Sequence, residues 1–146
     1  MDEPTGVLAN GLDYLKLIDK PKEILKSIFH NLFCSKFEII DINYDTLKII
    51  TPFKDSSNDL IQIYIQFDWS SKKITMTDDG YTAYYLHIRG IDNDSLIEKI
   101  IKNYNLEFDS NKIYININFS ENNLVSEKIN NFIQAMIILL NLDEFY

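Results

Sequence analysis

Apolar residues recur with a helical period near the start of the chain. Pro21 fits the first turn of a helix, where a backbone N–H has no helical partner, and Asp19 is placed to cap that end. The pattern predicts a helix over residues 19–34. The residues that share its apolar face are Ile24, Leu25, Ile28, Phe29, Leu32 and Phe33.

From Lys36 onward the period changes to two, which is typical of β-strands. Residues 36–77 contain four alternating segments with short turn-like sequences between them, and the clearest segment is LIQIYIQFDW, residues 60–69. We therefore expect an antiparallel four-stranded meander with one buried and one solvent face. The residues expected on the buried face of the clearest strand are Ile61, Ile63, Ile65, Phe67 and Trp69.

The second half of the chain alternates between helical and strand patterns. Residues 82–104 have helical spacing, and Gly90 divides them as a typical helix-ending residue. Residues 106–119 read as a second hairpin, and residues 121–142 read as a C-terminal helix. A sheet with one apolar face needs a cover, which these helices can supply. The pattern predicts one α+β domain over residues 1–146, a four-stranded meander plus a second hairpin covered on one face by helices.

Composition limits the compartment in which we expect the protein. Of the 146 residues 46% are hydrophobic, which is enough for a continuous core, and the single Cys34 cannot form an internal disulfide. The N-terminus has acidic residues in place of a signal-like apolar stretch. The longest apolar run, Ala135–Leu140, is much shorter than the roughly 20 residues that cross a bilayer. We expect a cytoplasmic protein with no membrane span.

Charge limits the partners. The chain has 22 acidic residues against 14 Lys and Arg, for a net charge of -8, and the excess of acids lies after residue 54. A surface of this sign repels phosphate backbones, so direct binding of nucleic acid is disfavoured. The same surface attracts basic proteins, and it can occupy a cationic groove that nucleic acid would otherwise fill.

The stretch TMTDDGYTAYYL, residues 75–86, contains the strongest candidate for a site. Asp78, Asp79 and Gly80 form a turn signal, and either Asp79 or Thr82 can accept N–H groups at the start of the following helix. The alternative is a carboxylate site for a divalent cation, in which both acids join a pair from the preceding loop, Asp55 and Asp59. A meander places these two loops at the same end of the sheet.

Few other residues indicate catalysis. The chain has no glycine-rich phosphate loop, HExxH or CxxC motif, so we expect a binding protein that needs neither a cofactor nor a metal. A metal-dependent hydrolase or nuclease that uses the aspartate cluster is the alternative.

Two surfaces are candidates for contact with other proteins. Tyr64 and Tyr114, with amide neighbours on the solvent face of the predicted strands, have the composition of a protein-recognition surface. The apolar C-terminal helix is first a core helix and second a surface for homodimerisation.

Two segments carry a resemblance to a known family. ITPFKDSSNDLIQIYIQ, residues 50–66, followed by ITMTDDGYTAYYLHIRGI, residues 74–91, resembles the DUF1828 family of bacteria and their phages. The resemblance implies a phage or mobile-element setting and assigns no activity. The residues that match the family pattern are Thr51, Pro52, Phe53, Asp55, Asp59, Tyr64, Asp78, Asp79, Gly80 and Thr82. Together with the charge, it leads us to expect a small acidic phage-type or prophage-type protein that binds, and inhibits, a basic host or defence protein.

Overall fold

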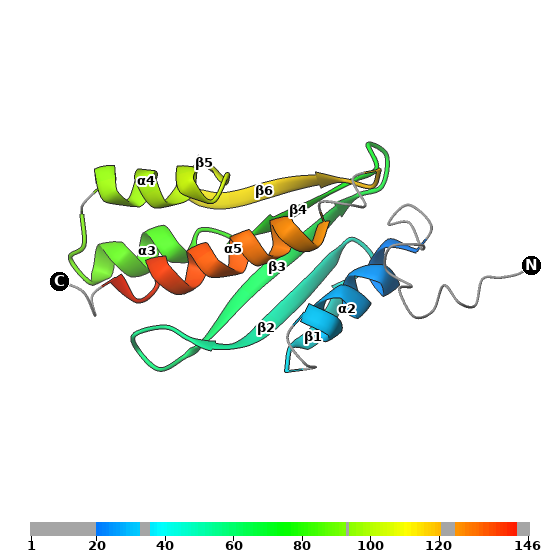
Figure 1. Ribbon diagram of the computed structural model, residues 1–146, viewed down its shortest axis with the longest axis horizontal. Coiled ribbons are helices and arrows are strands. Elements are labelled where there is room, and N and C mark those ends of the chain that lie inside the picture. Colours follow the sequence, from blue (N-terminus) through cyan, green and yellow to red (C-terminus); the bar gives the residue numbers. More distant parts are fainter. Residues whose placement is uncertain (1–19, 33–35, 93, 121–124, 143–146) are drawn as a thin grey trace, which may run out of the picture.

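A computed structural model describes residues 20–32, 36–92, 94–120 and 125–142 of the chain. Six antiparallel strands form one sheet in the order β1-β2-β3-β4-β6-β5, and helices pack against it (Figure 1). The α+β fold class is thereby confirmed. The strands are β1 Glu38–Asn43, β2 Thr46–Lys54, β3 Leu60–Asp68, β4 Lys73–Thr77, β5 Glu107–Asp109 and β6 Lys112–Asn118. The helices are α2 Pro21–Leu32, α3 Tyr81–Ile88, α4 Asp94–Asn103 and α5 Val125–Leu139.

The predicted meander and the second hairpin belong to one continuous sheet. The first four strands pair in chain order, and β6 then pairs with β4, so that the hairpin β5–β6 extends the meander. Helices α3 and α4 form the long connection between β4 and β5. Because this connection leaves and re-enters at the same region of the sheet, it places both helices beside the β5–β6 hairpin.

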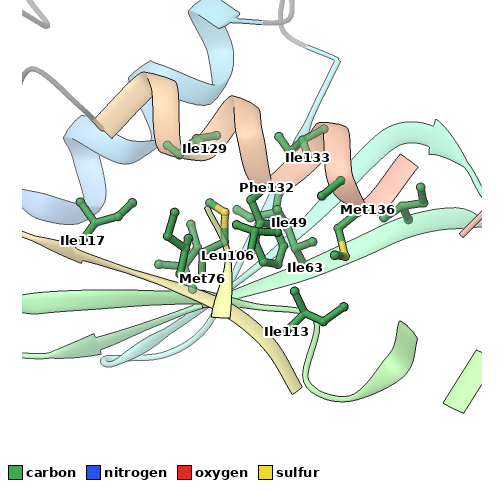
Figure 2. Close-up of a cluster of buried hydrophobic side chains, with 14 of the residues drawn as sticks. Ile49, Ile63, Met76, Leu106, Ile113, Ile117, Ile129, Phe132, Ile133 and Met136 are labelled. Atoms are coloured by element: carbon green, nitrogen blue, oxygen red, sulfur yellow. The ribbon is translucent and has the colours of Figure 1, made fainter. Parts of the chain in front are cut away.

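The core lies between the sheet and α5. Figure 2 shows Ile129, Phe132, Ile133 and Met136 of α5 directed toward apolar side chains of the strands. Phe132 has no exposed surface, and complete burial of a side chain of this size stabilises the fold by about 1.5–3 kcal/mol. The apolar side of the C-terminal helix is therefore used inside the molecule. The strand residues labelled in this cluster are Ile49, Ile63, Met76, Ile113 and Ile117.

Helix α2 covers the part of the sheet that α5 does not reach (Figure 1). Its residues Leu25 and Phe29 have no exposed surface, and the centre of the Phe29 ring lies 5.3 Å from the centre of the Phe37 ring. The Lys22 ammonium lies 2.7 Å from Oδ1 of Asp41 and so ties α2 to β1. The ends of the predicted helix, including Asp19 and Phe33, lie outside the described residues, as do residues 121–124 of the predicted C-terminal helix.

The two faces of the sheet differ as the alternation predicts. Ile61, Ile63 and Ile65 are at most 3% exposed, whereas Gln62 and Gln66, on the opposite face of the same strand, are exposed.

The two tyrosines predicted on the solvent face lie in one row across three strands. Tyr64 pairs with Thr77, and Thr77 pairs in turn with Tyr114. Both tyrosines are half-buried, and Thr77 between them is 4% exposed. The open face thus has a small aromatic centre among polar neighbours.

Candidate functional site

The turn between β4 and α3, residues 78–80, is organised by one buried carboxylate. Asp78 is 2% exposed. Its Oδ1 accepts hydrogen bonds from the backbone N–H of Gly80 at 2.9 Å and of Ile113 at 3.0 Å. Its Oδ2 accepts the N–H of Thr82 at 2.9 Å. Asp78 therefore fixes the start of α3 and holds that start to β6.

The expectation that Asp79 or Thr82 caps α3 is wrong, since Asp78 accepts the N–H groups. Asp79 and Gly80 both have positive φ, 57° and 87°, and these two left-handed residues fold the first turn of α3 back over Asp78. The Asp79 side chain is exposed, and its Oδ1 lies 3.3 Å from the Lys112 ammonium. The hydroxyl of Thr82 is buried and donates instead to the sulfur of Met136 at 3.5 Å.

The turn between β2 and β3, residues 55–59, is built in a similar way around Asp55. This side chain is 4% exposed, and its Oδ1 accepts the N–H groups of Ser57 at 2.9 Å and Asp59 at 3.0 Å. Its Oδ2 accepts the phenolic hydroxyl of Tyr81 at 3.2 Å. Asp59 contributes its main chain to the turn, and its side chain is exposed.

The two turns meet at one end of the sheet, as the meander predicted, but their four acids do not form a metal site. Asp55 and Asp78 use their oxygens to organise separate turns, whereas Asp59 and Asp79 are exposed. Within the described residues, no group of three or more His, Cys, Asp or Glu side chains is placed to hold a metal ion.

Polar side chains of α3 and of Arg89, the residue directly after this helix, also reach the β2–β3 turn. The hydroxyl of Tyr85 lies 2.5 Å from Oγ of Ser56 and 3.0 Å from Oγ of Ser57. Arg89, the single arginine of the chain, donates to Oγ of Ser57, and its guanidinium lies 4.9 Å from the centre of the Tyr85 ring. These contacts hold the side of α3 that carries Tyr85 against the β2–β3 turn. Arg89 therefore has a structural use at this position.

On the other side of α3 lies a cleft of about 680 Å³, bounded by α3, α4 and the β5–β6 hairpin. Its floor is apolar, because Leu86, Ile97, Ile101 and Ile113 line it. Tyr84 and Phe108, which are 62% and 45% exposed, also line it from α3 and β5. The remaining lining residues are Gly80, Thr82, Ala83, His87, Ile91, Asp92, Asp94, Glu98 and Asn111.

Three acids, Asp92, Asp94 and Glu98, form what we call the acidic rim of the cleft. All three are exposed. Within the part of the chain that the structure describes, none of their carboxylates has an ion-pair or side-chain hydrogen-bond partner. The cleft therefore combines an apolar floor with unneutralised negative charge.

The residues singled out from the sequence divide among three places. Gly80 and Thr82 line the cleft, Tyr64 and Tyr114 lie on the open face of the sheet, and the four aspartates belong to the two turns. Sequence reasoning missed Tyr84, Asp94, Glu98 and Phe108. The sequence of α3 did contain a signal for an exposed apolar surface. Large apolar residues lie on all sides of this helix, and only some of them can face the core.

Comparison with known families agrees with this architecture. The family described as "Domain of unknown function DUF1828" has a sequence model that matches residues 51–138, more than half of the chain. The chain belongs to the DUF1828 family. The region shared with DUF1828 begins in β2 and ends in α5, so it contains both turns and the whole cleft. No curated protein and no solved structure matches this DUF1828 chain. Among its described residues, no helix has the length and apolar character needed to cross a membrane.

Proposed function

We propose that this DUF1828 chain is a small acidic binding protein that acts by stoichiometric attachment to a basic protein partner. The observation that carries the proposal is the exposed apolar side of α3. Tyr84 and Ile88, four residues apart on this helix, are 62% and 59% exposed, and Tyr84 also lines the cleft. Aromatic side chains that are exposed beside a concave apolar surface are typical of protein-protein interfaces.

Charge favours a basic partner. The chain has a net charge of -8, and the rim of the cleft adds a local concentration of carboxylates to this overall field. Opposite charges on two proteins accelerate their association, and salt weakens that attraction. The class of partner that fits best is a host or defence protein whose cationic groove normally holds nucleic acid. A phage or prophage origin, inhibition of that protein and a cytoplasmic location are parts of the same proposal.

The experiment compares the wild-type chain with a variant of the exposed α3 side. The immobilised protein is incubated with a bacterial lysate, the retained proteins are identified, and the partner is then purified and mixed with the chain for analytical ultracentrifugation. We expect a basic protein that dissociates at high salt and forms a complex of fixed stoichiometry. The double substitution Tyr84→Ser and Ile88→Ser should abolish the complex.

A matched control separates this effect from a general loss of exposed apolar surface. Tyr44 is 74% exposed and lies in the turn between β1 and β2, whereas α3 follows β4. Tyr44→Ser should therefore leave the complex intact. Retention of chaperones alone at low and high salt, or a complex that the double substitution leaves unchanged, would contradict the proposal.

A further inference from the structure

The geometry of the cleft points to the kind of segment that it binds. We propose that the cleft between α3, α4 and the β5–β6 hairpin receives an amphipathic segment of the partner protein. One large apolar side chain of this segment lies on the isoleucine floor, and a neighbouring lysine or arginine contacts Asp94 and Glu98. This inference rests on the proposed function, because it assigns that function a surface and a recognised chemistry.

Helix α4 lines the cleft with both acidic and apolar side chains. Asp94, Ile97, Glu98 and Ile101 follow the spacing i, i+3, i+4, i+7, which places them on one side of the helix, and all four line the cleft. Acidic and apolar side chains therefore alternate along one wall. A ligand that matches this wall needs an apolar group and a cation within about one helical turn of each other.

The carboxylates at the acidic rim are exposed and available to a partner. Carboxylates in a protein usually pair with a cation where one is near, as Asp41 does with Lys22 at 2.7 Å. Asp94 and Glu98 have no such partner among the described residues. Both acids lie on the same side of α4. A lysine or arginine supplied by another protein would lie one turn from an apolar floor. The apolar side chain that covers this floor in the complex would shield the new ion pair from water and so strengthen it.

Two aromatic residues lie beside the apolar floor of the cleft. Tyr84 of α3 and Phe108 of β5 line the same cleft from two different elements, and each keeps a large exposed surface. Aromatic faces attract a guanidinium or ammonium group, and they also pack against the aliphatic stem of lysine or arginine. Acidic segments and nucleic acids would instead meet repulsion at the rim.

The test begins with a displayed library of random peptides that is selected on the wild-type protein. We expect the selected peptides to share a large apolar residue within one helical turn of a lysine or arginine. A synthetic peptide with the selected sequence is then titrated by calorimetry against the full chain and its variants. Asp94→Asn combined with Glu98→Gln keeps the shape of the side chains and removes the charge, so we expect an affinity about tenfold lower.

Two further variants complete the series. Tyr84→Ala removes a side chain that is 62% exposed, and the expected loss of peptide affinity is about thirtyfold, as for a residue at the centre of an interface. Glu38→Gln combined with Glu127→Gln removes two exposed charges that lie outside the cleft and should leave the affinity unchanged.

Several results would overturn the inference. One is selected peptides that are acidic or uncharged, and another is a selected peptide whose binding the Asp94 and Glu98 variants leave unchanged. A peptide that maps to Tyr64 and Tyr114 on the open sheet face would also overturn it while leaving the proposed function intact. If no peptide is selected although the partner complex can be reconstituted, the inference is likewise overturned and the proposed function stays intact. If the lysate yields no partner either, the proposed function fails as well.

Discussion

The phenolic hydroxyl of Tyr81 donates to Oδ2 of Asp55 over 3.2 Å, and this bond joins residues that are 26 positions apart in the chain. Tyr81 begins α3, and Asp55 opens the β2–β3 turn. Because Asp55 is only 4% exposed and its other oxygen closes its own turn, this carboxylate organises local and distant structure at once. The acid-rich end of the sheet is thus a structural junction that sets where α3 starts, and hence where the cleft lies.

Removing the Asp55 carboxylate should lower the stability of the protein. The side chain accepts two backbone N–H groups and one phenolic hydroxyl, and Asp55→Ala leaves these donors without a partner. Loss of hydrogen bonds to a charged group costs about 1.5–3 kcal/mol, so we expect a decrease in the free energy of unfolding of about 2–3 kcal/mol. Unfolding in urea, followed by circular dichroism, measures this quantity.

Asp59→Ala is the matched control, because its side chain is exposed and only its main chain takes part in the turn. A substitution of this type should change stability by less than about 0.5 kcal/mol. Equal losses for Asp55→Ala and Asp59→Ala would show that the buried carboxylate does not organise the turn.

High pH should weaken the fold through Tyr81. Burial raises the pKa of Tyr81 to about 12 from its ordinary value of 10.0, and the charge of Asp55 adds to the rise. The unfolded chain therefore loses this proton first. The stabilisation is complete below pH 10.0 and is lost as the pH rises toward about 12. Because the side chain is 41% exposed, screening by solvent keeps the contribution small.

We therefore expect the free energy of unfolding to fall more steeply across this pH window in the wild type than in Tyr81→Phe. Urea unfolding at a series of pH values measures both slopes, and the other tyrosines are common to both proteins. Identical slopes would contradict the raised pKa.

The strand faces could be predicted from the sequence because a strand with one buried face must alternate. In β3, Ile63 and Ile65 are buried, and Gln62 and Gln66 are exposed, as the pattern of apolar residues requires. The turns were predictable for a related reason, since Gly80 accepts the positive φ of 87° that the β4–α3 turn needs. These features depend on neighbours in the chain.

The role of Asp78 was not predictable because one of its three donors is distant. Gly80 and Thr82 follow it directly, but Ile113 belongs to β6, and the local pattern does not reveal that β6 pairs with β4.

The cleft was missed for a similar reason. Helix α4 has adjacent apolar pairs, Leu96 with Ile97 and Ile100 with Ile101, so its apolar positions extend around more than one side. The sequence alone does not tell which side meets the core and which remains open to a partner.

Asp78 and its neighbour Asp79 should differ strongly when each is changed to asparagine. Asp78→Asn places an amide NH₂ among three backbone donors, and we expect a loss of about 3 kcal/mol in the free energy of unfolding. Asp79→Asn disturbs only an exposed ion pair with Lys112, which is worth about 0–1 kcal/mol. Thermal and urea unfolding of both variants measure the difference. Losses of similar size would contradict a structural role that is specific to Asp78.

Divalent cations test the metal-dependent alternative directly. At Asp55 and Asp78 the carboxylate oxygens already face N–H or hydroxyl donors, so a cation would have to displace those hydrogen bonds before it could coordinate. The free energy needed to open two buried turns offsets the gain from coordination. We therefore expect no saturable heat when Mg²⁺ or Mn²⁺ is titrated into the protein, and no rise in Tm beyond that caused by sodium chloride of equal ionic strength. Saturable binding that both Asp59→Ala and Asp79→Ala abolish would contradict this expectation and would favour a hydrolase or nuclease, because the exposed acids would then be the ligands.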